Sequence, residues 1–97
     1  MPVYEFEWDP EKAKGNLRKH GIAFEEPATV FLDSRAVSVY DTGHGAGEDR
    51  WTTLGLASTG RVLVVCHAFR EVRRNRPVVR MFSSRKAARK ERKAYGG

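Results

Sequence analysis

The side chains best suited to chemistry in this sequence are basic, and they gather in its C-terminal part. Residues 61–97 contain twelve Lys and Arg residues against two Glu, whereas residues 1–60 contain six basic and ten acidic residues. The net charge of the whole chain is +6. A surface this one-sided usually faces an anionic partner, most often nucleic acid. The alternatives are a membrane surface, a disordered acidic protein, or a solvated surface with no partner.

Arg80 and Arg85 stand on either side of a predicted change from strand to helix. Residues 77–82, PVVRMF, are typical of a short strand, and the Ala, Arg, Lys and Glu residues that follow Arg85 are strong helix formers. Ser83 or Ser84 would begin that helix, because a Ser side chain there can accept a hydrogen bond from an N–H of the first turn. The two arginines are therefore predicted to lie close to a strand–helix junction.

The predicted terminal helix has one thin packing stripe and is basic elsewhere. Ala87, Glu91 and Tyr95 recur at four-residue spacing, so they share one side of the helix. We interpret Tyr95 as a packing residue rather than a catalytic one, and Glu91, which interrupts the stripe, as the structural partner of an arginine. The rest of the circumference carries Lys86, Arg89, Lys90, Arg92 and Lys93.

The histidines are the candidates for proton transfer. His67 lies within the apolar segment 61–69, where a buried core histidine and an acid–base catalyst are about equally expected. His44 lies in a glycine-rich segment, so we expect it to be exposed and free to titrate. His20 ends a predicted helix, a position that favours a structural hydrogen bond.

The composition fits one domain over residues 1–97. The single Cys66 lies in an apolar run and is expected to be a buried, unreactive thiol. Cys, His and carboxylate residues show no metal-ligand spacing, so we expect neither a metal nor another cofactor. The longest apolar run, residues 62–66, is far too short to cross a bilayer, and the first residues lack the pattern of a signal peptide. We therefore expect a cytoplasmic protein without a membrane partner.

The predicted elements follow the order β-α-α-β-β-β-β-α, a small α+β fold. Asp9 and Pro10 are typical of a helix start, and Gly21 of a helix end. We expect a twisted antiparallel sheet whose last four strands form a meander, with two helices against one face and a basic helix at the end. The expected strands are residues 3–8, 36–40, 51–58, 61–69 and 77–82, and the expected helices are residues 10–20, 25–32 and 85–95.

Four stretches of the chain resemble the BrnT family of toxins from bacterial type II toxin–antitoxin modules. They are FEWDPEKAKGNLRKHGIAFEEPATVF at 6–31, GEDRWTTLG at 47–55, RVLVV at 61–65 and SSRKAARKERKAY at 83–95. The resemblance implies a RelE/ParE-like toxin fold and a ribonuclease that stops translation. It also implies an antitoxin of the BrnA type with a ribbon-helix-helix domain, so that operator DNA is bound only through the antitoxin. Ala23 and Pro27 depart from the family pattern in a way that weakens the second helix.

This resemblance implies metal-independent cleavage of RNA by attack of a 2′-hydroxyl on the adjacent phosphate. Such a reaction needs proton-transfer groups and cations that stabilise the developing charge. We predict that Arg80 and Arg85 hold the scissile phosphate, because guanidinium groups stay charged and match two phosphate oxygens. His67 or His44 would transfer the proton. The residues predicted to contact RNA are Arg61, Arg70, Ser83, Lys86 and Arg89.

Two other functions fit the same residues. The first is a binding module that holds nucleic acid or an acidic antitoxin segment without breaking a bond. The second, suggested by the ParE side of the resemblance, is the poisoning of a topoisomerase through the C-terminal helix.

Overall fold

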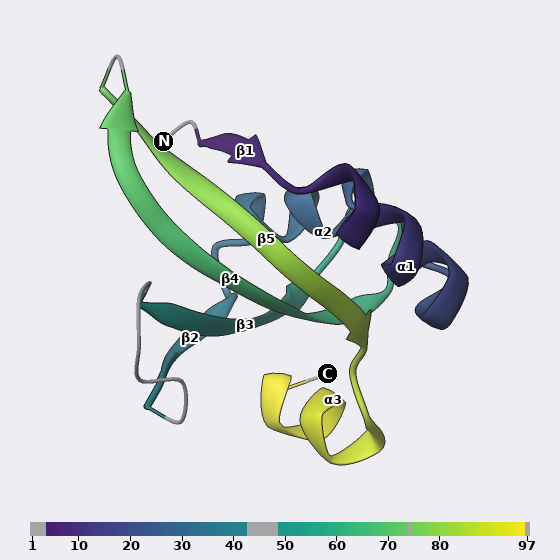
Figure 1. Ribbon diagram of the computed structural model, residues 1–97. Coiled ribbons are helices and arrows are strands. Elements are labelled where there is room, and N and C mark those ends of the chain that lie inside the picture. Colours follow the sequence, from purple (N-terminus) through teal and green to yellow (C-terminus); the bar gives the residue numbers. More distant parts are fainter. Residues whose placement is uncertain (1–3, 43–48, 74, 97) are drawn as a thin grey trace.

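The computed structural model describes residues 4–42, 49–73 and 75–96, and the side chains of residues 71–73 are left out of this description. Over these residues the chain forms five strands, three α-helices and one 3₁₀ helix (Figure 1). The mixed α+β class with five strands and three helices is thus confirmed. In chain order the elements are β1 (Glu5–Glu7), α1 (Pro10–His20), α2 (Glu25–Ala28), η1 (Thr29–Leu32), β2 (Val37–Asp41), β3 (Arg50–Leu56), β4 (Val62–Arg73), β5 (Arg76–Lys86) and α3 (Arg89–Tyr95).

The strands form one sheet in the order β1-β5-β4-β3-β2. Strands β2 to β5 are antiparallel neighbours, so the expected meander is confirmed. The expectation of a purely antiparallel sheet is wrong, because β1 runs parallel to β5, with Phe6 opposite Val79. The chain leaves β1 through two helices before the meander begins, and this long connection allows β1 to join the last strand in the parallel direction.

Local signals set the ends of α1 as expected. The side chain of Asp9 accepts a hydrogen bond from the Glu11 N–H, Pro10 is the first helical residue, and Gly21 ends the helix at a φ of 69°. The second helix is short, since α2 lasts four residues and continues as η1. Its first residue is preceded by Phe24, which makes no side-chain capping bond, in line with the weakness expected of this helix.

The last strand is longer than predicted, so the expected helix start at Ser83 or Ser84 is wrong. β5 continues through Arg85 to Lys86, with Ser84 opposite Val65 in the ladder. The Ser84 N–H also donates to the side-chain oxygen of Asn16 at 2.9 Å. These bonds outweigh the helix propensity of the local sequence, and α3 begins only at Arg89.

The two faces of the sheet differ in what covers them. The main core lies on the face that packs against η1 and α2, and α3 lies on the other side of the sheet (Figure 1). The core cluster consists of Ile22, Phe24, Val30, Ala57, Leu63, Val65, Val79 and Met81. None of the helices in the described part of the chain is both long and apolar enough to cross a membrane.

Candidate nucleic-acid interface

An open hollow lies where β5 ends and the chain turns toward α3. Its volume is about 280 Å³, and its lining includes three cationic side chains from three different segments. Arg61 precedes β4, Lys86 ends β5 and Arg92 belongs to α3, and the Ala87 N–H donates to the Val62 carbonyl at 2.9 Å to hold the segments together. We call this the cationic hollow; it is lined by Gly60, Arg61, Val62, Lys86 and Arg92.

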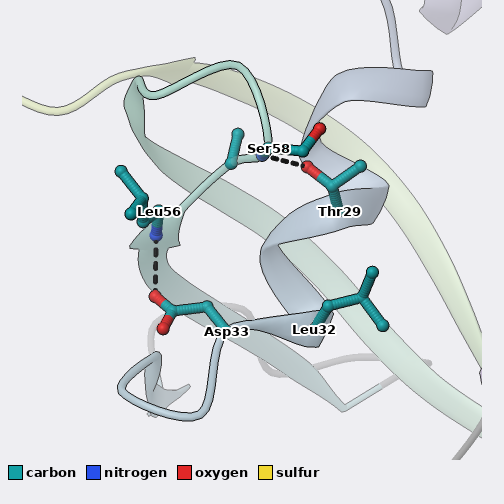
Figure 2. Close-up of a pocket in the computed structure, with 6 residues that line it drawn as sticks. Thr29, Leu32, Asp33, Leu56 and Ser58 are labelled. Carbon is teal, nitrogen blue, oxygen red and sulfur yellow. Dashed lines mark hydrogen bonds between the residues drawn. The ribbon is translucent and has the colours of Figure 1, made fainter.

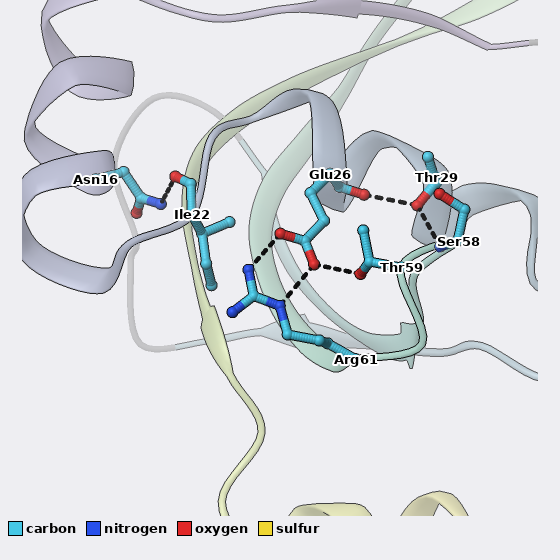
Figure 3. A network of polar contacts seen from close by, with 7 residues as sticks. All are labelled: Asn16, Ile22, Glu26, Thr29, Ser58, Thr59 and Arg61. Atoms are coloured by element: carbon cyan, nitrogen blue, oxygen red, sulfur yellow. Dashed lines mark hydrogen bonds and ion pairs between the residues drawn. The ribbon is translucent and has the colours of Figure 1, made fainter.

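The orientation of Arg61 is fixed by Glu26 of α2 (Figure 3). Arg61 Nε donates to Glu26 Oε2 at 2.7 Å, and Nη2 donates to Oε1. The hydroxyl of Thr59 donates to the same carboxylate. The side chain of Glu26 is 12% exposed and that of Arg61 is 36% exposed. The hydrogen bonds from Arg61 lower the pKa of Glu26 despite the opposing effect of burial, so Glu26 is a carboxylate that positions the guanidinium at the hollow.

The other cations near the hollow are less constrained. Lys86 is exposed, and Arg92 makes one long hydrogen bond, 3.5 Å from Nη1 to the Ala87 carbonyl. Within the described part of the chain, the exposed bases Arg89, Lys90 and Lys93 of α3 have no carboxylate partner. Helix α3 therefore adds unpaired positive charge next to the hollow.

Arg80 and Arg70 lie away from the hollow and share a carboxylate. Arg80 Nη1 is 3.2 Å from Glu7 Oε2, and Arg70 Nη1 is 2.6 Å from the same oxygen. Arg80 is opposite Ala68 in the ladder, while Glu7 is opposite Arg80 on the parallel strand β1. These pairs join β1, β4 and β5, which gives both arginines a structural role.

Arg85 is likewise engaged, by two bonds to Glu91. The Nη1–Oε1 and Nη2–Oε2 distances are 2.8 and 2.9 Å. Glu91 Oε1 also accepts from the Ala88 N–H at 2.7 Å, which caps α3. The hydrogen bonds from Arg85 and then from Ala88 lower the pKa of Glu91 to about 2. The interpretation of Glu91 as the partner of an arginine is confirmed.

His67 lies in the core, on the opposite face of the sheet from Arg80 and Arg85. It is fully buried, with Nε2 2.6 Å from the Thr53 hydroxyl and with Phe31 and Phe69 packed edge-on against its ring. Burial lowers the pKa of His67 to about 4, so the ring is neutral at pH 7. The structure therefore does not bring His67 together with either arginine. The other predicted proton-transfer residue, His44, lies outside the described residues.

Tyr95 holds the C-terminal end of α3 to Asp33, the residue that follows η1. Its hydroxyl donates to Asp33 Oδ2, and the guanidinium of Arg35 lies over its ring, 5.5 Å from the ring centre. Asp33 also accepts from the Leu56 N–H at 2.9 Å, at the edge of a small hollow of about 240 Å³ (Figure 2). Tyr95 is thus engaged in packing α3 against the body.

The hollow contains two of the residues predicted to contact RNA, Arg61 and Lys86. Of the others, Arg89 lies exposed on α3, Ser83 is exposed on β5, and Arg70 is paired with Glu7. Sequence reasoning missed two functional candidates. Arg92 was only one of many bases on the predicted helix. Glu26 lies in the acidic first turn of α2, thirty-five residues before Arg61, so no local pattern links the two.

Comparisons with known proteins agree with this fold. The crystal structure of the Brucella abortus ribonuclease toxin BrnT, at 1.1 Å resolution, superposes with a TM-score of 0.62 at 18% sequence identity, covering 90% of this chain and 100% of that one. This likeness establishes a shared fold. A comparison with curated proteins found no match. A family model described as the ribonuclease toxin BrnT of type II toxin–antitoxin systems matches residues 8–91. Because that match spans most of the sequence, the chain belongs to the BrnT family of ribonuclease toxins.

Proposed function

We propose that this chain is a metal-independent endoribonuclease that cleaves RNA, inhibits translation in the cytoplasm, and binds RNA phosphates in the cationic hollow. The observation that carries the proposal is the convergence of Arg61, Lys86 and Arg92 from three segments onto one open hollow of about 280 Å³. Membership of a ribonuclease toxin family supports RNA as the anion that fills it.

The reaction proposed here is attack of a ribose 2′-oxygen on the neighbouring phosphorus. The 2′-O–P bond forms and the P–5′-O bond breaks, giving a 2′,3′-cyclic phosphate and a free 5′-hydroxyl. The 2′-hydroxyl loses its proton and the 5′-oxygen gains one. Negative charge grows on the phosphate oxygens during attack, and fixed cations in a preorganised site stabilise it. Guanidinium and ammonium groups can provide this charge without a metal ion.

The assignment of the phosphate to the hollow replaces the predicted site at Arg80 and Arg85. In the folded chain these arginines pair with Glu7 and Glu91 respectively, and neither of them lines the hollow. Arg61 is bound as well, but through Nε and Nη2, which leaves the Nη1 side of its guanidinium for a phosphate. We assign Glu26 as the positioning residue for Arg61.

We also propose that the partner is an antitoxin of the BrnA type, and that operator DNA is bound only through it. The family belongs to type II systems, in which a toxin is paired with an antitoxin. The basic surface of α3 suits an acidic protein segment as well as RNA.

The direct test is incubation of the purified chain with RNA of defined sequence in excess EDTA. We expect cleavage products that carry a 2′,3′-cyclic phosphate and a 5′-hydroxyl. Cleavage that requires added divalent metal, or products with a 5′-phosphate, would contradict the proposal. The buried position of His67 favours a second candidate function, the RNA-binding module, which the same assay would reveal as salt-sensitive binding to RNA that stays intact.

A further inference from the structure

An open apolar groove lies beside α3 on the face of the sheet opposite the main core. Its volume is about 300 Å³. Val37 and Val39 form part of its lining and are 52% and 61% exposed, although both are large aliphatic residues. The full lining consists of Val37, Val39, Thr52, Leu54, Val64, Glu91 and Ala94. Exposed aliphatic side chains beside an apolar groove mark a candidate docking site.

The groove runs along a free sheet edge. Among the described strands, β2 is the last in the sheet and pairs only with β3. Val37 and Val39 are opposite Leu54 and Thr52 in the ladder, so the four side chains share one face. A free edge offers unpaired backbone groups to an added extended segment, whose alternate side chains would then point into the groove.

Positive charge borders the apolar surface. Lys90 lies one helical turn before Ala94, so it stands at the rim of the groove on α3. Lys90 and Lys93 have no carboxylate partner among the described residues, whereas Glu91 is neutralised by Arg85. The surface therefore suits an occupant that is both apolar and acidic.

We propose that this groove and the outer edge of β2 bind an extended acidic segment of the protein antitoxin. Its alternate aliphatic side chains fill the groove, and one of its carboxylates pairs with Lys90. A second copy of the chain is the poorer occupant, because it would bring two bodies of net charge +6 together. RNA is also a poorer occupant, because it has no aliphatic side chains that could fill the apolar groove. The inference rests on the proposed function in taking the antitoxin as the partner.

This placement also explains how an antitoxin segment in the groove inhibits RNA cleavage at the hollow. Arg92 lines the cationic hollow on one side of α3, while Ala94 lines the groove on the other. A segment in the groove would thus bring negative charge to within one helix width of the proposed RNA site. It would lower the positive potential there without occupying the hollow.

The test is calorimetric titration of the purified chain with the BrnA-type antitoxin proposed above as its partner, using the variant Val39→Glu. A carboxylate in the groove is expected to weaken antitoxin binding about tenfold or more. The matched control is Leu32→Glu, since Leu32 is 65% exposed but lies on η1, away from the groove. Val39→Thr keeps the branched shape and is expected to weaken binding several-fold, and Lys90→Glu to weaken it most at low salt.

The outcomes separate this inference from the proposed function. We expect Val39→Glu to keep wild-type RNA cleavage and to lose inhibition by the antitoxin, while Leu32→Glu keeps both. Wild-type antitoxin affinity in the folded Val39→Glu and Val39→Thr variants would overturn the inference. So would a change in oligomeric state that Val39→Glu causes in the absence of the antitoxin, because it would identify a second copy of the chain as the occupant. The titration needs no RNA cleavage, so a failure of the ribonuclease proposal would be seen independently.

Discussion

Arg85 and Glu91 form a two-bonded ion pair that links the end of β5 to the first turn of α3. The same carboxylate caps the helix by accepting from the Ala88 N–H. No residue of α3 is buried, so this pair and the Tyr95–Asp33 bond are the main polar links holding a cationic helix beside the hollow.

We predict that Glu91→Gln loosens α3 while leaving the sheet intact. The change removes charge from the Arg85 pair and from the cap, and its cost in unfolding free energy is expected to be about 1 kcal/mol because the pair is partly solvated. Hydrogen exchange should show faster exchange in α3 but not in β4. The effect should fade at low pH, because the stabilisation from Glu91 is present above its ordinary pKa of 4.5 and is lost as the pH falls toward about 2. Equal acceleration in β4 would contradict a local role.

Glu26→Gln is predicted to lower both stability and RNA cleavage. It weakens the hold on Arg61 and the bond from Thr59 in a poorly exposed site, at a cost of about 1–2 kcal/mol in unfolding free energy. The neighbouring Glu25→Gln is the control, since Glu25 is exposed. If Glu26 positions Arg61, the loss of cleavage should persist at temperatures where the variant is fully folded. If the substitution affected only stability, RNA cleavage would return to the wild-type level at those temperatures.

The stability contribution of His67 is predicted to depend on pH in a definite direction. Its pKa is lowered from 6.5 to about 4 by burial, so between these pH values the unfolded chain binds more protons than the folded chain. Stability should therefore fall as the pH drops from 6.5 toward 4, by up to about 3 kcal/mol. Urea unfolding at several pH values, compared between wild type and His67→Gln, measures this contribution. An unchanged pH dependence in the variant would show that His67 is not the buried neutral group described.

His67→Gln should also retain RNA cleavage at temperatures where it is folded. Its ring faces the core rather than the arginines of the opposite face or the cationic hollow. Complete loss of cleavage in a folded variant would restore His67 as a proton-transfer residue and contradict the site proposed here.

Two glycine-to-alanine changes are predicted to have opposite effects. A Cβ at Gly55 would lie 2.7 Å from Val30 Cγ1 and 2.9 Å from Ala36 Cβ, so Gly55→Ala should destabilise the fold by about 1–3 kcal/mol. A Cβ at Gly15, inside α1, meets nothing within 4 Å, and Gly15→Ala should stabilise by about 0.5–1 kcal/mol. Thermal unfolding of the pair tests the packing of η1 on β3. Similar changes in melting temperature for both variants would contradict the close packing of η1 against Gly55.

The parts of the fold that depend on neighbouring residues could be predicted from the sequence. Asp9, Pro10 and Gly21 fix the ends of α1 by local bonds and backbone preference, and each acts as expected. The end of β5 could not be predicted, because Ser84 pairs opposite Val65 in the ladder and its N–H donates to Asn16, and both partners are distant in the sequence.

The candidate site was predictable only in outline. The charge pattern placed a basic surface at the β5–α3 junction, and Arg61 and Lys86 do line a hollow there. The Arg85–Glu91 pair is local, but the pairing of Arg80 and of Arg61 depends on carboxylates far along the chain. Glu7 binds Arg80 and Glu26 binds Arg61 across distances that no local pattern reveals.

The most direct test of the account is RNA binding by the double variant Lys86→Ala/Arg92→Ala, measured with a 2′-O-methyl RNA oligonucleotide, which cannot be cleaved by attack of a 2′-hydroxyl. The control is Arg18→Ala/Lys19→Ala, which likewise removes one Arg and one Lys, from exposed positions on α1. We predict that the hollow variant binds about tenfold or more weakly, with a salt dependence reduced by roughly one to two ions, while the control binds nearly as wild type. Equal loss in both variants would show that the cationic hollow is not where RNA binds.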